Sequence, residues 1–229
     1  MKTAILIDGG FFVKRAKILF GDMTPDKLAK KINDYCKSHL NSDKQCKREL
    51  YRIFFYDCPP LTKKMHHPIT QKAIDFSRTP EYSWRMNLHQ ELRKCRKVAL
   101  RLGNLDEINA EWTVRQETLK KVFAGKIKFE DLEESDVMIN TKQKGVDMRI
   151  GIDIASIAYK KQVDQIILIA GDSDFVPAAK LARREGIDFV LDPMWNPIKP
   201  DLFEHIDGLK TVCPNPDKKK NTGSPHPAK

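Results

Sequence analysis

Residues 166 to 191 read IILIAGDSDFVPAAKLARREGIDFVL, two apolar runs joined by an amphipathic segment. The continuous apolar run from Ile166 to Ala170 is typical of a parallel strand that is buried on both faces. A helix is predicted from Phe175 to Glu185, because Pro177 falls in its tolerant first turn and Gly186 ends it. A second buried strand is predicted from Ile187 to Leu191. Strand, helix and strand in this order predict an α/β sheet with mostly parallel strands and right-handed crossovers.

The same alternation extends over the rest of the chain. Lys2 to Ile7 predicts a strand, and Phe11 to Phe20 has the apolar spacing of a helix. Further elements are predicted on the same grounds: a helix after Pro25, a strand over 50–56, a helix near 82–94, a strand near 98–102 and a helix over about 147–161. We expect one domain over 1–212, with 60–135 as a divergent, partly inserted region, and a disordered basic tail over 213–229.

Aspartates follow two of the predicted strands. Asp8 directly follows the first strand, and Asp172 and Asp174 follow the strand that ends at Ala170. In parallel α/β sheets the functional crevice lies beyond the carboxyl ends of the strands. Each acid alone is as well explained as a helix N-cap or a turn residue. Three acids in two loops at the same edge favour a metal site.

Asp147 gives an independent indication of a metal site. On a helical projection it falls within the apolar stripe of Ile150 and Ile154, so its side chain is expected to face the sheet rather than water. A carboxylate in the interior is costly unless it is paired or bound to a cation. Asp153 lies at the margin of the same stripe and is interpreted as a structural or supporting residue, with Arg149 as its expected partner. Asp57 also ends a strand, but Pro59 and Pro60 favour a turn there.

Carboxylate ligands without His or Cys select Mg²⁺ or Mn²⁺ over zinc. Such a cluster suits phosphodiester hydrolysis, in which the ion activates water and stabilises the charge that develops on the phosphate. No Ser-His-Asp or Cys-His arrangement is apparent that would supply a side-chain nucleophile instead.

The charge of the chain indicates a polyanionic partner. Forty-one Lys and Arg against 31 Asp and Glu give a net charge of +10. From Asp106 to Asp136 the balance turns acidic, whereas residues 84 to 101 are strongly basic. An ordinary solvated helix face explains that basic run equally well. The candidates for nucleic-acid binding are Arg85, Arg93, Lys94, Arg96 and Lys97.

The cysteines and the apolar runs narrow the class of protein. Five cysteines form no C-x-x-C pair, which argues against a disulfide scaffold or a zinc ribbon and favours a reducing cytoplasm. No apolar run approaches the roughly 20 residues of a membrane helix, so no membrane partner is expected.

Four blocks of sequence, in this order, resemble the LabA-like branch of the NYN domain family, within the PIN-like nuclease superfamily. They are Ile5–Gly9, Lys142–Asp147, Leu168–Phe175 and Arg183–Gly186, and Asp207-Gly208-Leu209 adds a fifth, weaker similarity. The resemblance implies an α/β/α sandwich around a parallel sheet, RNA as the usual substrate, and Asp8, Asp147, Asp172 and Asp174 as metal ligands with Ser173 as a polar helper. Gly10-Phe11 departs from the family, since many members carry Asn two residues after the first Asp-Gly.

Two functions are consistent with this sequence. The first is a Mg²⁺- or Mn²⁺-dependent endoribonuclease that acts on RNA, with single-stranded RNA as one option. The alternative is a regulator that keeps the fold, binds RNA or protein and turns over little or nothing. A haloacid-dehalogenase-type phosphatase or a response-regulator receiver fits poorly, because Asp8 is followed by Gly9-Gly10.

Overall fold

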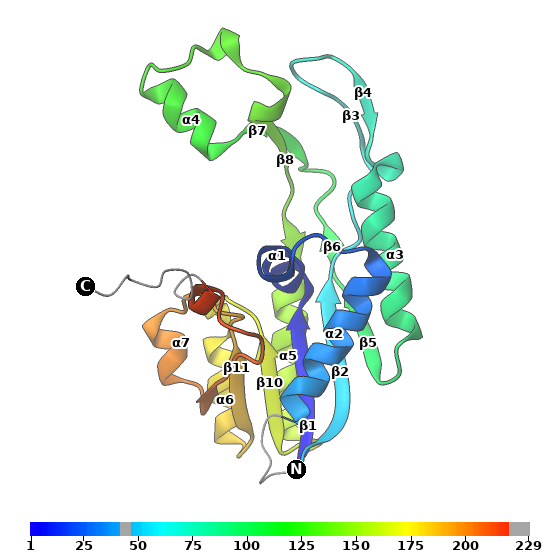
Figure 1. Ribbon diagram of the computed structural model, residues 1–229, viewed down its shortest axis with the longest axis vertical. Coiled ribbons are helices and arrows are strands. Elements are labelled where there is room, and N and C mark those ends of the chain that lie inside the picture. Colours follow the sequence, from blue (N-terminus) through cyan, green and yellow to red (C-terminus); the bar gives the residue numbers. More distant parts are fainter. Residues whose placement is uncertain (42–46, 220–229) are drawn as a thin grey trace, which may run out of the picture.

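The computed structural model describes residues 1–41 and 47–219, and a six-stranded parallel sheet is its centre (Figure 1). The strand order is β12-β11-β10-β1-β2-β5, and every neighbouring pair is parallel. The strands are β1 (Lys2–Asp8), β2 (Glu49–Asp57), β5 (Val98–Leu102), β10 (Gln165–Ile169), β11 (Asp188–Asp192) and β12 (Gly208–Leu209). All six therefore end at one edge of the sheet, called the carboxyl edge below.

Helices cover both faces of the sheet. One face carries α1 (Gly9–Phe20), α2 (Pro25–Leu40) and α3 (Pro80–Lys94). The other carries α5 (Val146–Tyr159), α6 (Val176–Arg184) and α7 (Pro200–Glu204). The predicted α/β/α sandwich with a parallel central sheet is confirmed.

The alternation of side chains along β1 explains the two layers. Ala4 and Leu6 pack with α5 and α6, whereas Ile5 and Ile7 pack with α1 and α2. All four side chains are fully buried. A strand that is apolar on both faces must be covered on both faces, and this places β1 at the centre of the sheet.

The region between β2 and α5 carries two antiparallel hairpins. One pairs β3 (Lys64–His66) with β4 (Ala73–Asp75). The other pairs β7 (Glu111–Val114) with β8 (Val137–Asn140), and α4 (Gln116–Phe123) lies in its connection. A short ladder of β6 (Asn104–Leu105) with β9 (Gln143–Lys144) joins the two arms that lead to and from the second hairpin. In Figure 1 both hairpins project beyond the carboxyl edge of the sheet.

Short 3-10 helices occur in several of the connections. They are η1 (Phe76–Arg78), η2 (Phe129–Asp131), η3 (Glu134–Asp136), η4 (Ser173–Phe175) and η5 (Pro216–Lys219). Cys213 is buried, so the packed chain continues beyond the predicted boundary at 212. The rest of the predicted tail, 220–229, lies outside the described residues. Within 1–41 and 47–219 no helix is long and apolar enough to cross a membrane.

Candidate metal and nuclease site

Three separate segments bring the predicted acids to the carboxyl edge. β1 ends at Asp8, and η4, directly after β10, contains Asp174. α5 runs back toward the amino edge before β10, so its first turn, with Asp147, also lies at the carboxyl edge. The charge of Asp147 contributes to raising the pKa of Asp8, and the charges of Asp172 and Asp174 contribute to raising the pKa of Asp147.

Asp8 is held firmly at the start of α1. Its Oδ1 accepts a hydrogen bond from the Phe11 backbone N–H at 3.0 Å, which makes it the N-cap of the helix. Gly9 is required here because a Cβ at this position would clash with the Phe55 ring and the Tyr56 carbonyl. Burial, together with the charges of Asp147 and Asp57, raises the pKa of Asp8 from 3.8 to about 6.

Asp147 differs from its predicted orientation, because its side chain is exposed to solvent rather than directed at the core. Val146 beside it is buried, and the first turn of α5 extends past the strand ends. The apolar stripe of Ile150 and Ile154 therefore does not continue over sheet at this turn. Partial burial and the nearby charges of Asp172 and Asp174 raise the pKa of Asp147.

Asp172 and Asp174 line the loop after β10. Asp172 Oδ1 accepts a hydrogen bond from the Asp174 backbone N–H at 3.2 Å, and both residues are exposed. Ser173 begins η4, and its side chain lies outside what the structure describes. Gly171 is required before them, because a Cβ there would overlap the Phe11 ring and lie 3.2 Å from Asn196 Nδ2.

The donor chemistry of this edge suits a hard divalent cation. Asp8, Asp147, Asp172 and Asp174 offer only oxygen ligands, and their mutual repulsion is the condition that a bound cation relieves. Among residues 1–41 and 47–219, no three His, Cys, Asp or Glu side chains are grouped closely enough to form a ready-made ligand shell. The metal assignment therefore rests on the acids' chemistry and placement.

Two amides near the acids were not singled out from the sequence. A Cβ on Gly10 would lie 3.5 Å from Asp8 Oδ1 and 3.7 Å from Gln143 Nε2, so the Gln143 amide and the Asp8 carboxylate both lie close to Gly10. Asn196 approaches the loop at Gly171. Gln143 belongs to a block that resembles the family, and that position was the available signal for it.

Asp57, interpreted from the sequence as a turn residue, is instead a buried anion. It ends β2 beside Asp8, in register Asp8 with Tyr56, and is fully buried. Arg85 Nη2 donates to its Oδ1 at 2.8 Å, and His89 Nε2 lies 2.7 Å from its Oδ2. Arg85 is thus the one member of the predicted nucleic-acid-binding set that the structure places at the carboxyl edge.

Asp153 binds side chains from two strands of the sheet. Arg101 binds both of its oxygens at 3.0 Å, and the Tyr56 hydroxyl donates to Oδ2 at 2.8 Å. The expected pairing with Arg149 is wrong, because Arg101 on β5 reaches Asp153 across the sheet. Asp153 therefore joins α5 to β2 and β5.

The other predicted RNA-binding residues form what we call the basic turn: Arg93, Lys94, Arg96 and Lys97. This turn connects the end of α3 to the start of β5, so it lies at the amino edge. Lys97 donates to the Leu50 carbonyl and Lys94 pairs with Glu91, whereas Arg93 and Arg96 are exposed. The structure does not bring these four residues together with the acids.

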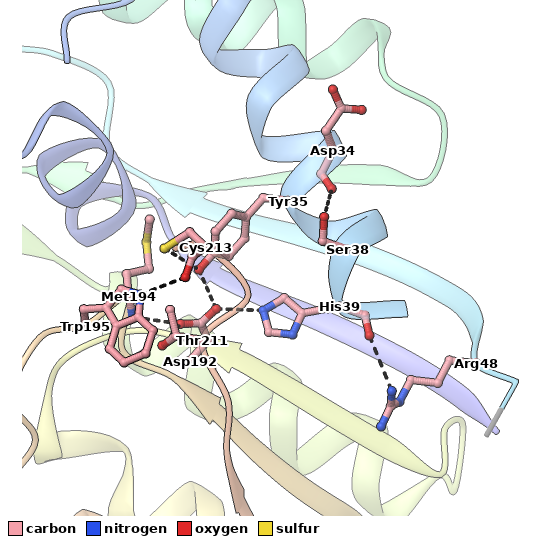
Figure 2. Close-up of polar contacts among 10 residues, drawn as sticks. All are labelled: Asp34, Tyr35, Ser38, His39, Arg48, Asp192, Met194, Trp195, Thr211 and Cys213. Carbon is pink, nitrogen blue, oxygen red and sulfur yellow. Dashed lines mark hydrogen bonds and ion pairs between the residues drawn. The ribbon is translucent and has the colours of Figure 1, made fainter. Parts of the chain in front are cut away.

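Asp192, a further buried carboxylate at the carboxyl edge, has a structural role (Figure 2). Asp192 ends β11 and is fully buried. It accepts hydrogen bonds from the Tyr35 hydroxyl at 2.6 Å, Thr211 Oγ1 at 2.8 Å and the Met194 N–H at 2.7 Å. His39 Nε2 lies 2.7 Å away. Because these groups already surround both oxygens, Asp192 joins α2 to the C-terminal segment.

A model of the NYN domain family matches residues 2–196. No curated protein sequence matches the chain. A crystal structure of a protein of unknown function from Vibrio parahaemolyticus RIMD 2210633 is similar over 91% of this chain and 90% of that chain, at 15% identity and a TM-score of 0.45. Similarity at that level supports no argument about function. The family match, in contrast, spans every element from β1 to β11 and includes all four edge aspartates, so this chain belongs to the NYN domain family, within the PIN-like nuclease superfamily.

Proposed function

We propose that the protein is a metal-dependent endoribonuclease of the LabA-like branch, acting in a reducing cytoplasm with Mg²⁺ or Mn²⁺. Asp8, Asp147, Asp172 and Asp174 are the proposed ligands and catalytic residues. Four cysteines of the described chain, Cys36, Cys58, Cys95 and Cys213, are free thiols, which is consistent with a reducing compartment.

One observation carries the proposal: acids from three separate segments lie at the edge where parallel sheets place function. N-capping explains Asp8, but it does not explain why Asp172 and Asp174 lie where their charges raise the pKa of Asp147. Like charges that lie near one another are unfavourable, and a bound divalent cation would relieve their repulsion.

Backbone N–H groups and one amide side chain position the groups of the proposed site. The Phe11 N–H fixes the Asp8 carboxylate, and the Asp174 N–H fixes that of Asp172. Gln143 supplies an amide close to Gly10 that suits a phosphate or sugar oxygen. A divalent ion held there supplies Lewis-acid stabilisation of a phosphodiester under attack and makes water a stronger nucleophile at neutral pH.

RNA is the proposed substrate. The net charge of +10 favours a polyanion, and Arg85 provides a cation close to the acids. A regulator that binds RNA without cleaving it is the second candidate, and the lack of a closed ligand shell in the described residues is the observation that favours it.

Cleavage assays distinguish the two. Purified protein is incubated with mixed RNA and DNA in Mn²⁺, in Mg²⁺ and in EDTA. Cleavage of RNA should require the metal and should be lost in Asp8→Asn and Asp172→Asn, with Asp34→Asn on α2 as the exposed control. Circular dichroism confirms that each variant is folded. Cleavage in EDTA, or full activity in both site variants, would remove this mechanism.

A further inference from the structure

An apolar pocket of about 540 Å³ lies on the face that carries α1, α2 and α3. Its walls include Val13, Met23, Leu28, Pro60, Pro80 and Trp84. Pockets of about 300 to 1,000 Å³ with mostly apolar walls are typical of sites for small ligands. This pocket is large enough for a planar aromatic ring.

The pocket lies near the carboxyl edge, where the acids also lie. Pro60 follows the end of β2, and Pro80 begins α3, which runs from this edge to the amino edge. Val13 is on the helix that starts directly after Asp8, about 8 Å further along its axis at 1.5 Å per residue. A polymer whose backbone passes Asp8 therefore comes within reach of the pocket.

Trp84 presents a fixed aromatic surface. Its Nε1 donates to the Met23 carbonyl at 3.0 Å, and this bond ties the start of α3 to the loop between α1 and α2. The indole is only partly buried. An aromatic side chain held in this way is the usual platform on which an unpaired base stacks.

Charged groups at the rim suit the polar parts of a nucleotide. Arg85 lines the pocket while its guanidinium binds Asp57, and Asp57 acts electrostatically on Asp8. Glu81 is exposed at the rim and offers oxygens to an exocyclic amino group. Lys17 pairs with Asp22 at 2.9 Å on the opposite side.

We propose that this pocket binds one unpaired nucleobase of an RNA strand, stacked against Trp84, while the backbone crosses the carboxyl edge at Asp8. The inference rests on the proposed function for the identity of the polymer. It specifies the substrate further, because a base held in a duplex cannot enter the pocket. The preferred substrate is therefore single-stranded RNA or an extruded base.

The test measures binding without cleavage. Fluorescence anisotropy in EDTA gives the affinity for a short oligoadenylate and for an abasic ribose-phosphate chain of equal length. The ratio of the two affinities reports the base alone, because backbone electrostatics cancel. The wild type should prefer the oligoadenylate by about 5- to 150-fold, which corresponds to about 1 to 3 kcal/mol for one stacked base.

Two variants remove the pocket in different ways, by truncation in Trp84→Ala and by filling in Val13→Trp. Both should bring the ratio close to one. Ile18→Trp is the matched control, since Ile18 is exposed on the same helix and outside the pocket lining. It should keep the wild-type ratio. A duplex of the oligoadenylate should bind equally to all four proteins.

Each result separates this proposal from the nuclease proposal. A wild-type ratio near one, or an unchanged ratio in Val13→Trp, would show that the pocket does not bind a nucleobase. The pocket would then be assigned to an apolar ligand or side chain. Metal-dependent cleavage can still be present in that case. Conversely, a pocket-dependent ratio in a protein that cleaves nothing would keep the base site and reject the nuclease.

Discussion

His89 Nε2 lies 2.7 Å from Asp57 Oδ2, and neither side chain has any exposure to solvent. Arg85 binds the other oxygen of the same carboxylate. Within the described chain, His89 Nδ1 is one of three buried side-chain polar atoms without a hydrogen-bond partner. The anion of Asp57 therefore holds two cationic or polar groups of α3 against the end of β2.

Removal of this anion should destabilise the fold. Asp57→Ala leaves Arg85 and His89 without their shared partner, and the loss of one member of a buried pair costs about 3 to 5 kcal/mol of unfolding free energy. Urea denaturation measures the change. Asp22→Ala, which removes an exposed partner of Lys17, should leave the midpoint unchanged. Equal effects of the two substitutions would show that the buried network contributes nothing.

Two glycines should respond to alanine with opposite signs. Gly171→Ala should destabilise by about 1 to 3 kcal/mol, because its Cβ would overlap the Phe11 ring. Gly151→Ala in α5 meets no described atom within 4 Å and should stabilise by about 0.5 to 1 kcal/mol. Thermal melting checks both. Phe11→Ala combined with Gly171→Ala should recover part of the loss, and no recovery would contradict the steric explanation.

Thermal melting also tests whether the acids share one cation. In EDTA, Asp147→Asn and Asp174→Asn should melt at or above the wild-type temperature, because each removes a repelling charge. Millimolar Mn²⁺ should reverse the order, since an ion at a hundredfold excess over its Kd stabilises the wild type by about 2.7 kcal/mol. An equal shift of all three proteins by Mn²⁺ would mean that the acids form no common site.

The raised pKa of Asp8 predicts a specific pH dependence. Burial is the largest cause of the shift from 3.8 to about 6, so the folded state holds this proton more tightly than the unfolded chain. The resulting stability is fully present below about pH 3.8 and is lost as the pH rises to about 6.

Asp8→Asn lacks this titration. In EDTA, the stability of the wild type relative to Asp8→Asn should fall across that pH window, by at most about 3 kcal/mol, and then level off. Urea denaturation at a series of pH values measures the difference. A difference that is flat from pH 4 to 7 would show that Asp8 titrates normally.

The basic turn should contribute to the binding of long RNAs and not to the binding of short ones. It lies at the amino edge, and β5 alone separates the two edges by about 16 Å at 3.3 Å per residue. Neutralising Arg93, Lys94, Arg96 and Lys97 should flatten the salt dependence of binding to long RNA by about 0.7 for each phosphate that the protein no longer neutralises. Cleavage of RNAs of a few nucleotides should not change. An unchanged salt slope would assign this turn to an ordinary solvated surface.

Local patterns predicted the central layers of the fold well. The strand over 98–102 coincides with β5, and the helix and strand after Gly171 correspond to α6 and β11. These segments have regular apolar spacing and clear end signals, so local sequence patterns are sufficient to predict them. The hairpins between β2 and α5 were not predicted, because their short strands have no strong alternation and are defined by pairing across the chain.

The site could be predicted in part. Asp8, Asp172 and Asp174 were located by their place after strands, which is a consequence of chain order. The exposure of Asp147 was missed, since a helical projection does not show where the sheet ends. Asp57 was missed because Arg85 and His89 reach it from a distant helix. Such contacts depend on tertiary packing, which spacing along the chain does not reveal.

The central position of β1 determines when the sheet can be completed during synthesis. β1 pairs with β10, and Thr3 and Gln165, which hydrogen-bond across this pair, are 162 residues apart in the chain. At about 5 to 20 residues per second, a ribosome needs roughly 8 to 30 s to make the intervening chain. A nascent chain released only as far as β5 carries Asp8 without Asp147, Asp172 or Asp174. The proposed metal site is therefore completed late in translation, after most of the domain has left the ribosome.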